Sequence, residues 1–455
     1  MSAQQKTLRS RALKSTNWTV FGHFFGQLLR LVSNLILTRL LAPEMFGVMA
    51  VVYLFIMGIH MFSDIGLSQN VISSKRSDDK KFLDTIWTIQ ILKGFVVFLL
   101  SIPIAAALYY TGELGWLAKD RVYANPELPY LIIAVSITSI ISGHNSVNLL
   151  VLNKKLLLGK VTSMELLSQF IGLVFLVTLA WFWRDIWALV IGNIFTTSLR
   201  MLFSHHSSFG PRYQLRWDKS SASEIIHFGK WIFLSTILGF ALGQGDRILL
   251  SLWMTPSDLG VYSIAFFLGT ALKVLMQKVT SSVFYPVLSE INQEQPERLC
   301  EIYYRIRAKV DFLAMVVAGF IASTGTLIVK VLYDDRYIEA GWMLEILSLS
   351  VIFVGYMLAG AVLLAKGDGK RTAVLTFIAT AGFFVSVLVF YDLYGIKGAL
   401  FAIALNYLID LPTGFYMMKK YNILQLSKEF RMLPFFFVAY GIGTVVENFF
   451  NSWII

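Results

Sequence analysis

The sequence predicts an all-α polytopic membrane protein made of two six-helix bundles and one further C-terminal apolar segment. Of its 455 residues, 56% are hydrophobic and only 15% are charged, whereas about a quarter of the residues of a soluble protein are charged. Apolar runs of about 20 residues, long enough to cross the hydrocarbon core of a bilayer, recur along the whole chain. An internal repeat, described below, relates the two halves. Together these observations exclude a soluble globular protein.

Windows of this length predict about thirteen membrane helices. We expect them at residues 18–38, 46–70, 82–108, 129–151, 162–182, 186–203, 229–252, 259–285, 310–330, 342–364, 372–390, 396–417 and 433–450. The last segment is apolar enough to span the membrane. It is equally compatible with one half of a hairpin whose second helix is not part of this chain.

Lysine and arginine residues sort by side of the membrane. The N-terminal tail and the connections after even-numbered helices hold most of them: Lys6, Arg9, Arg11, Lys14, Lys75, Arg76, Lys80, Lys81, Lys154, Lys155, Lys160, Arg212, Arg216, Lys219, Lys230, Arg298, Arg305, Arg307, Lys309, Lys366, Lys370, Arg371, Lys419, Lys420, Lys428 and Arg431. The other side holds only Arg39, Lys119, Arg121, Arg184, Lys330, Arg336 and Lys397. Because cytoplasmic loops carry such an excess, the N-terminus is predicted to be cytoplasmic. Topology therefore explains most of the net charge of +11 without a nucleic-acid partner.

Two stretches at equivalent places in the chain repeat each other. "LAPEMFGVMAVVYLF" (Leu41 to Phe55) and "MTPSDLGVYSIAFFL" (Met254 to Leu268) align without gaps, with matching Pro, Gly and Val residues. Both copies follow the first helix of a half, in the same orientation, which predicts a parallel repeat about the membrane normal. The alternative is coincidence, since Pro and Gly are ordinary in turns between helices. The repeat predicts domains at 1–210 and 211–420, followed by the apolar segment 421–455.

One face of the first helix is polar. His23, Gln27, Arg30 and Asn34 are spaced so that all four side chains share that face. Arg30 lies deep in the span, as do Lys93 and Lys273 in theirs. Each costs about 2.5–3.5 kcal/mol in mid-membrane, so they are expected to face water or carboxylates rather than lipid.

Polar residues also recur at helical spacing on three other helices. These stripes comprise Tyr53, Met57, His60, Asp64 and Ser68; Asn193, Thr197 and Arg200; and Lys273, Gln277 and Ser281. Since basic residues predominate, they predict a cationic aqueous cavity, which suits an anionic, phosphate-bearing cargo. The alternative is hydrogen bonding between helices, worth about 0.6 kcal/mol per pair. That alternative is favoured for Asn34, and the cavity for Arg30.

The stretch "GFALGQGDRILL" (Gly239 to Leu250) combines several glycines with Asp246 and Arg247. Glycines weaken a helix. This stretch is either a hinge with a gating ion pair or a thin packing face that ends in a fixed pair, and the residues alone do not separate the two.

Motifs for several kinds of chemistry are absent from the sequence. It has no G-x-x-x-x-G-K-[ST], H-E-x-x-H or G-x-S-x-G, and its histidines do not cluster as metal ligands. We therefore expect no cofactor and no metal. The energy source is expected to be an ion gradient (H⁺ or Na⁺), the membrane potential or the gradient of the cargo itself. The single cysteine, Cys300, excludes intrachain disulfides.

Four stretches carry a resemblance to a known family. "RLLAPEMFGVMAVV", "DIGLSQNVI", "GDRILLSLWMTPSDLGVYSIAFFL" and "VLYDDRYIEAGWMLEILSLS" resemble the polysaccharide transporters (Wzx-type oligosaccharide flippases) of the MOP superfamily. The resemblance implies two six-helix bundles in a V. It also implies a non-enzymatic flippase that carries undecaprenyl-diphosphate-linked oligosaccharide across the bacterial inner membrane by alternating access. Exopolysaccharide, O-antigen or capsule assembly would use the product, with membrane lipids and polysaccharide polymerase machinery as partners.

The resemblance also suggests roles for individual residues. The substrate would contact His23, Gln27, Arg30, Asn34, Lys93, Arg247, Lys273 and Gln277. The coupling ion would bind at His60, Asp64 and Asp246. Two alternatives stay open: a multidrug or cation antiporter of the same superfamily, which would favour an acidic, aromatic cavity, and a membrane polysaccharide polymerase, which would need acidic residues in a substantial outer loop.

Overall fold

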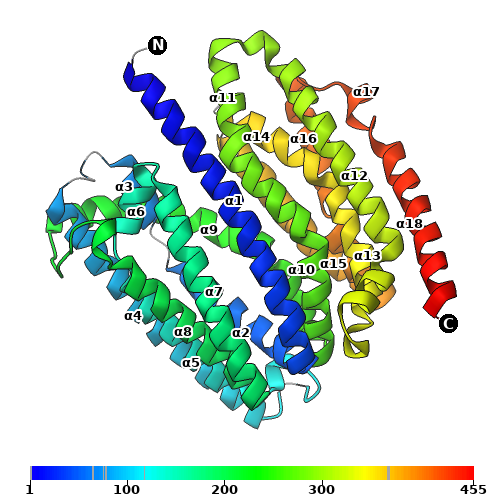
Figure 1. Ribbon diagram of the computed structural model, residues 1–455, viewed down its shortest axis with the longest axis horizontal. Coiled ribbons are helices and arrows are strands. Elements are labelled where there is room, and N and C mark those ends of the chain that lie inside the picture. Colours follow the sequence, from blue (N-terminus) through cyan, green and yellow to red (C-terminus); the bar gives the residue numbers. More distant parts are fainter. Residues whose placement is uncertain are drawn as a thin grey trace. The chain divides into compact units, whose positions relative to one another are not determined.

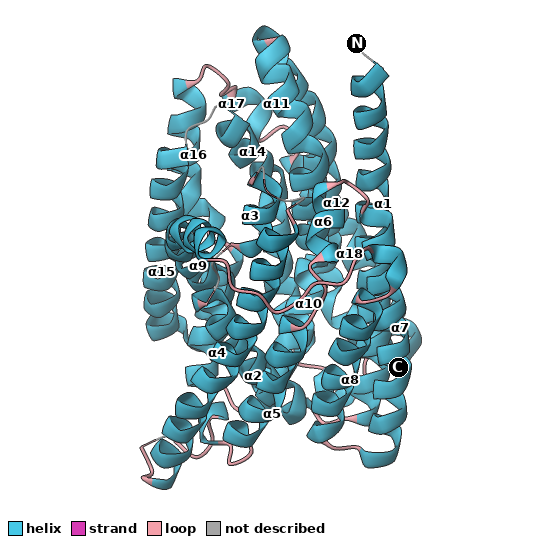
Figure 2. Cartoon of the chain, turned by 90° about the vertical axis from the view of Figure 1, so that its left-hand side faces the viewer, coloured by secondary structure: helices cyan, strands magenta, loops and turns pink. Residues whose placement is uncertain are grey.

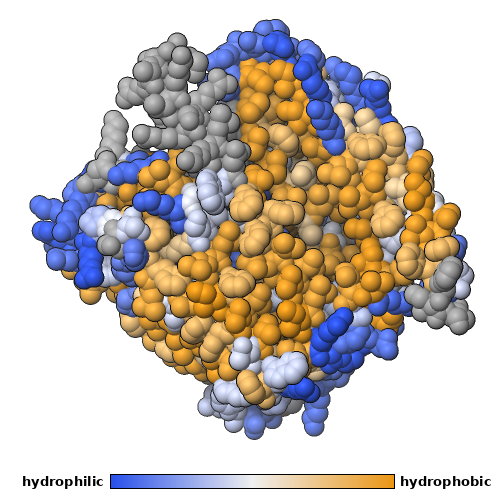
Figure 3. Space-filling view, in the orientation of Figure 1, coloured by the Kyte–Doolittle hydropathy of each residue, from blue (hydrophilic) through white to orange (hydrophobic). Residues whose placement is uncertain are grey.

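The computed structural model describes residues 3–63, 66–74, 76, 79–116, 118–365 and 369–454. The described residues form helices and loops, with no β-strand among them (Figures 1 and 2). Ten of the described helices are long and apolar enough to cross a membrane, or eleven if one bent pair counts as a single span. Hydrophobic residues cover most of the face visible in Figure 3, and hydrophilic residues gather near its margin. The prediction of an all-α polytopic membrane protein is confirmed.

Contacts divide the chain into two compact units, residues 1–259 and 260–455. The helices of the first unit are α1 (Ala3–Leu40), α2 (Pro43–Phe62), α3 (Leu67–Ser73), α4 (Lys80–Glu113), α5 (Leu128–Gly143), α6 (Asn148–Lys154), α7 (Leu158–Trp183), α8 (Ile186–Ser204) and α9 (Lys219–Trp253). Helix α9, which the repeat assigns to the second half, packs on α2 and α4 of the first unit. The domain boundary expected at residue 210 rests on the repeat rather than on contacts, and it stays a prediction.

Two expected spans of the first unit are interrupted. The span expected at 46–70 ends early, because α2 stops at Phe62 and the chain resumes as α3 after Gly66. Gly66 has a φ of +64°, a left-handed conformation that favours glycine and cannot continue a helix. The span expected at 129–151 is likewise two helices, since α5 and α6 meet at an angle of 64°.

Small residues bring α4 and α5 into backbone contact. A Cβ atom on Gly94 would lie 2.5 Å from the carbonyl oxygen of Ser139, and one on Gly143 would lie 3.0 Å from that of Gln90. Close approach through glycine is a common way for membrane helices to associate. The Gln90 side chain also donates hydrogen bonds to the carbonyls of Gly143 and Asn145, at 2.9 Å each. The end of α5 is therefore fixed against α4.

A charged cluster holds the starts of α4 and α9. Arg76 lies 2.9 Å from Asp79, 3.5 Å from Glu224 and 3.9 Å from Asp218. Asp79 and Asp218 each cap a helix by accepting a backbone N–H. The hydrogen bond from Arg76 lowers the pKa of the Asp79 carboxyl, and hydrogen bonds from Ser221 lower that of Asp218. The cluster therefore stays ionised outside the membrane.

The second unit contains most of α10 (Pro256–Val279), α11 (Tyr285–Glu294), α12 (Leu299–Leu332), α13 (Ala340–Ser348), α14 (Met357–Ala365), α15 (Gly369–Ala404), α16 (Tyr407–Lys420), α17 (Leu426–Glu429) and α18 (Leu433–Ile454). Helix α18 corresponds to the last apolar segment, expected at residues 433–450, and it packs along α12. The two backbones meet through Gly319, next to the Phe436 carbonyl, and Gly443, next to the Ser323 hydroxyl. The segment is thus an integral helix of this unit.

A buried arginine joins α12 to α17, and here the sequence-based expectation was wrong. Arg307, expected to be a loop charge at the membrane surface, has only 1% of its side chain exposed. Its guanidinium lies 3.1 Å from Asp311 and 2.5 Å from Glu429, and it donates a hydrogen bond of 2.8 Å to the Tyr303 hydroxyl. The Tyr356 ring covers it at 4.1 Å.

Tyr304 strengthens the same connection. Its hydroxyl donates to Glu429 at 2.6 Å and accepts the backbone N–H of Gln425 at 2.8 Å. Glu429 therefore has both an ionic and a neutral partner on α12, at the point where the chain enters α18. Breaking a buried ion pair from one side leaves the other charge uncompensated in a medium that cannot solvate it.

We predict that Glu429→Ala lowers the free energy of unfolding by about 3–5 kcal/mol, because the mutation leaves Arg307 short of one carboxylate. Thermal unfolding of the purified protein in detergent measures the effect as a lowered midpoint.

The matched control is Glu301→Ala. Glu301 pairs with Arg305 on the same helix, but more than 60% of both side chains is exposed, so its loss is expected to cost less than about 1 kcal/mol. Equal midpoints for the two variants would contradict the stabilising role of Glu429.

Candidate functional site

The polar face of α1 lies opposite an apolar face. Phe24, Leu28 and Val32 are more than 40% exposed, as expected for side chains that contact lipid. On the other side, Gly22 and Gly26 let α1 approach Thr162 and Gln169 of α7. This packing turns the polar stripe away from the lipid-facing side.

Arg30 lines a cavity of about 350 Å³ between α1, α2, α7 and α8. Ser33, Tyr53, Gln169 and Asn193 contribute its other main polar groups. Asn193 donates a hydrogen bond of 2.9 Å to the Tyr53 hydroxyl. The structure thus brings together members of three stripes that helical spacing had identified separately. Arg30 is the sole charged side chain among the described residues of this lining.

The neighbours of Arg30 on the stripe contribute differently. His23, Gln27 and Asn34 are half-buried. The side-chain oxygens of Gln27 and Asn34 are buried and have no hydrogen-bond partner among the described residues. Buried polar atoms of this kind are normally satisfied by protein, water or ligand. The stripe therefore retains acceptors that the described helices do not use.

A second cavity of the first unit, of about 310 Å³, contains Lys93 and His60. The His60 ring nitrogen Nε2 lies 2.8 Å from the Ser139 hydroxyl. Gln69 and Gln90 also line the cavity. Lys93 and His60 were expected to serve substrate and coupling ion respectively, and the structure places them in one cavity. Asp64, also expected to bind the coupling ion, lies outside the described residues.

Asp246 and Arg247 lie on α9, which continues through both residues as a helix. The Asp246 side chain is buried, and Arg247 donates a hydrogen bond of 2.7 Å to the Gln244 side chain. Helix α9 contacts α2 through Thr236, whose hydroxyl donates to the Met61 carbonyl, and through Phe240, which faces Gly58. Neither Asp246 nor Arg247 is among the residues that line the two cavities.

Lys273 and Gln277 belong to the second unit. The Lys273 ammonium lies 4.9 Å from the centre of the Tyr407 ring, a cation–π contact that offsets part of the cost of burying the charge. Gln277, one turn further along α10, is exposed. Arg200 of α8, a member of the predicted stripe with Asn193 and Thr197, forms an ion pair with Glu165 of α7 at 2.6 Å.

Sequence reasoning missed Gln169 and Ser139. Both helices are mostly apolar, and the polar residues near each one, such as Ser136 and Ser142 on α5 or Glu165 and Ser168 on α7, were not recognised as a stripe. Only their position opposite Arg30 and His60 in the folded chain shows their contribution.

The long apolar helices define a multi-pass membrane fold, and solved structures share this fold. The structure titled "Lipid II flippase MurJ, inward closed conformation" matches with a TM-score of 0.68 and 13% identity, over 96% of this chain and 98% of that chain. An inward-facing MATE family multidrug transporter of the MOP superfamily matches with a TM-score of 0.66 and 15% identity, over 87% and 94%.

The chain belongs to the polysaccharide biosynthesis protein family, whose model matches residues 36–341. Among its relatives is the lipopolysaccharide biosynthesis protein WzxC of Escherichia coli (strain K12), 21% identical over 97% of this chain and 89% of that protein. A membrane protein from the cps region of Klebsiella pneumoniae is 22% identical over 99% and 87%. The resemblance to Wzx-type flippases is confirmed.

We predict that a cysteine at position 30 reacts with a hydrophilic thiol reagent. The variant Arg30→Cys, made in a Cys300→Ser background, places its thiol in a polar cavity, and only the ionised thiolate reacts. Labelling is measured by mass spectrometry in intact membranes.

Leu28→Cys is the matched control, since it lies on the lipid-facing side of the same helix. We expect at least a tenfold slower reaction there. Equal labelling at both positions would contradict an aqueous cavity beside Arg30.

Proposed function

We propose that this protein is a flippase that moves undecaprenyl-diphosphate-linked oligosaccharide across the bacterial inner membrane. Membership of the polysaccharide biosynthesis protein family carries the proposal, together with relatives such as WzxC and the succinoglycan biosynthesis transport protein ExoT of Rhizobium meliloti. ExoT is 22% identical over 74% of this chain and 65% of its own length. The product would serve exopolysaccharide, O-antigen or capsule assembly.

The physical task is to lower the barrier to moving a diphosphate and several sugars through hydrocarbon. An unaided charge in mid-membrane is costly, so the path must supply groups that replace water. Arg30 and Lys93 supply fixed positive charge inside the first unit, each in a cavity with polar neighbours. Guanidinium and ammonium groups are the usual partners of phosphate oxygens. The polyprenyl chain stays in the bilayer, and no bond is made or broken.

Alternating access with ion coupling completes the proposed mechanism. Solved MATE transporters with this fold have been captured in both inward-facing and outward-facing conformations. An H⁺ or Na⁺ gradient would drive the cycle, with His60, Asp64 and Asp246 as the proposed coupling residues. His60 supports this role by its place beside Lys93, where a bound proton and a bound phosphate would influence each other. The proposed orientation places the N-terminus in the cytoplasm, with polysaccharide polymerase machinery receiving the product outside.

The antiporter of the same fold is the principal alternative. It would favour an acidic cavity for cationic drugs, whereas Arg30 and Lys93, the charged residues of the two described linings, are basic. A polysaccharide polymerase would need catalytic acids in a large outer loop. The connection between α4 and α5 comprises only residues 114–127, which leaves little room for such a site.

The test is to delete the gene in the native host and to measure lipid-linked oligosaccharide and surface polysaccharide together. We expect lipid-linked repeat units to accumulate on the cytoplasmic side and surface polymer to be lost, with rescue by the wild-type gene. Rescue by Arg30→Ala should fall about tenfold or more, because a hydrogen bond to a charged group contributes about 1.5–3 kcal/mol.

Arg39→Ala is the matched control, because Arg39 lies at the C-terminal end of α1 and is not among the residues that line the cavity. This variant should restore full polymer. Full rescue by Arg30→Ala would contradict the proposed role of Arg30 but would leave the proposal of a flippase standing. Absence of completed lipid-linked repeat units would indicate a synthetic enzyme. Normal polymer with altered drug sensitivity would favour the antiporter.

A further inference from the structure

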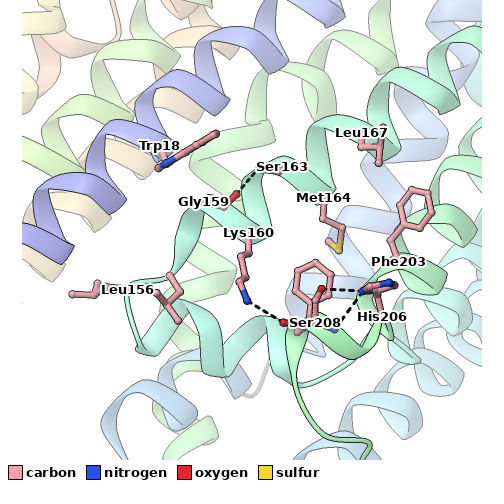
Figure 4. A pocket seen from close by; sticks show the side chains of 12 residues that line it. Trp18, Leu156, Gly159, Lys160, Ser163, Met164, Leu167, Phe203, His206 and Ser208 are labelled. Carbon is pink, nitrogen blue, oxygen red and sulfur yellow. Dashed lines mark hydrogen bonds between the residues drawn. The ribbon is translucent and has the colours of Figure 1, made fainter.

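A third cavity of the first unit lies apart from the two described above and shares no lining residue with them. It measures about 730 Å³ and lies where α1, the α6–α7 turn, α7 and the end of α8 meet (Figure 4). Neither the predicted stripes nor the proposed transport mechanism uses it. Its volume is about twice that of either of the other two cavities.

The walls of the cavity are mainly apolar. Its large apolar lining residues are Trp18, Leu156, Leu157, Met164, Leu167, Phe203 and Phe209. Trp18 packs directly on Gly159, where a Cβ atom would lie 3.2 Å from the indole nitrogen. Tryptophan is enriched at the level of lipid headgroups. The cavity therefore lies at the boundary between headgroups and acyl chains.

Two polar side chains, Lys160 and His206, line the same cavity. The Lys160 ammonium donates one hydrogen bond, of 3.0 Å, to the Ser208 carbonyl, and an ammonium has three N–H groups. The Nδ1 atom of His206 accepts the Ser208 backbone N–H at 3.3 Å. A neutral His206 ring then carries its proton on Nε2, which can donate to an anion. No carboxylate is among the described residues of the lining.

We propose that this cavity binds the headgroup phosphate and the upper acyl chain of an anionic phospholipid. Apolar walls suit the acyl chain, and Lys160 with His206 suits a single phosphodiester charge. The turn before α7 adds Lys155 to the local positive potential, which attracts anionic lipids. A zwitterionic headgroup would bring its own ammonium toward Lys160, so the site should discriminate against it.

Charge also distinguishes this occupant from the proposed transport substrate. A diphosphate carries more negative charge than one lysine can balance, whereas a phosphodiester carries a single negative charge. The occupant would bridge α1 and α7 at the water interface, where Gly159 and Trp18 already meet. The site therefore goes beyond the proposed flippase function and does not depend on it.

The test is native mass spectrometry of the purified full-length protein, with phosphatidylglycerol and phosphatidylethanolamine added in equal amounts. We expect the wild type to retain about tenfold more phosphatidylglycerol. Lys160→Gln should reduce this preference to near unity. Ser163→Trp, which fills the cavity from the first turns of α7, should lower the retention of both lipids.

Arg212→Gln is the matched control, because it removes an exposed positive charge near the cavity without touching its lining. It should behave as the wild type. Equal retention of the two lipids by the wild type, or an equal loss in Arg212→Gln and Lys160→Gln, would overturn the proposal. So would displacement of phosphatidylglycerol by an equimolar amount of undecaprenyl diphosphate, which would assign the cavity to the lipid carrier of the proposed transport substrate. Since the wild-type comparison needs no variant, a variant that fails to fold leaves the proposal testable.

Discussion

Hydrocarbon cannot solvate a charge, and the described part of this chain meets that constraint in three ways. Arg30 and Lys93 lie in polar cavities. Lys273 lies against the face of Tyr407. Arg307 is surrounded by carboxylates and phenols until almost none of it is exposed. The first arrangement places the charge in the wall of a cavity, whereas the last uses it to hold helices together. This difference separates candidate transport residues from residues that hold helices together.

Close helix contacts determine where the cavities can lie. Gly94 and Gly143 press α4 onto α5, and the same two glycines line the cavity of Lys93 and His60. Gly172 and Gly192 stand beside Thr196 and Leu176 in the cavity of Arg30. A membrane interior offers little hydrophobic drive for helices to associate, so packing of small residues supplies much of it. Larger side chains at these glycines would fill the cavities or push the helices apart.

The sequence predicted the class of fold and much of the Arg30 cavity, because hydropathy and helical spacing are local signals. Tyr53 and Asn193 were recognisable on polar stripes before their hydrogen bond was known. The early end of α2 was not recognised, because Asp64 and Ser68 continue the polar stripe of α2 at helical spacing past Phe62, and only the left-handed Gly66 shows the break. Arg307 was misassigned because its partner Glu429 lies far along the sequence, where no periodicity connects the two.

That long separation has a consequence for biosynthesis. Tyr304 and Glu429 are 125 residues apart, so the ribosome releases α12 well before α17 exists. Throughout that interval the guanidinium of Arg307 has only Asp311 as an anionic partner from the cluster, and α12 cannot settle in its final, dry surroundings. The buried cluster is therefore complete only after Glu429 has been synthesised, immediately before α18, the last helix of the unit.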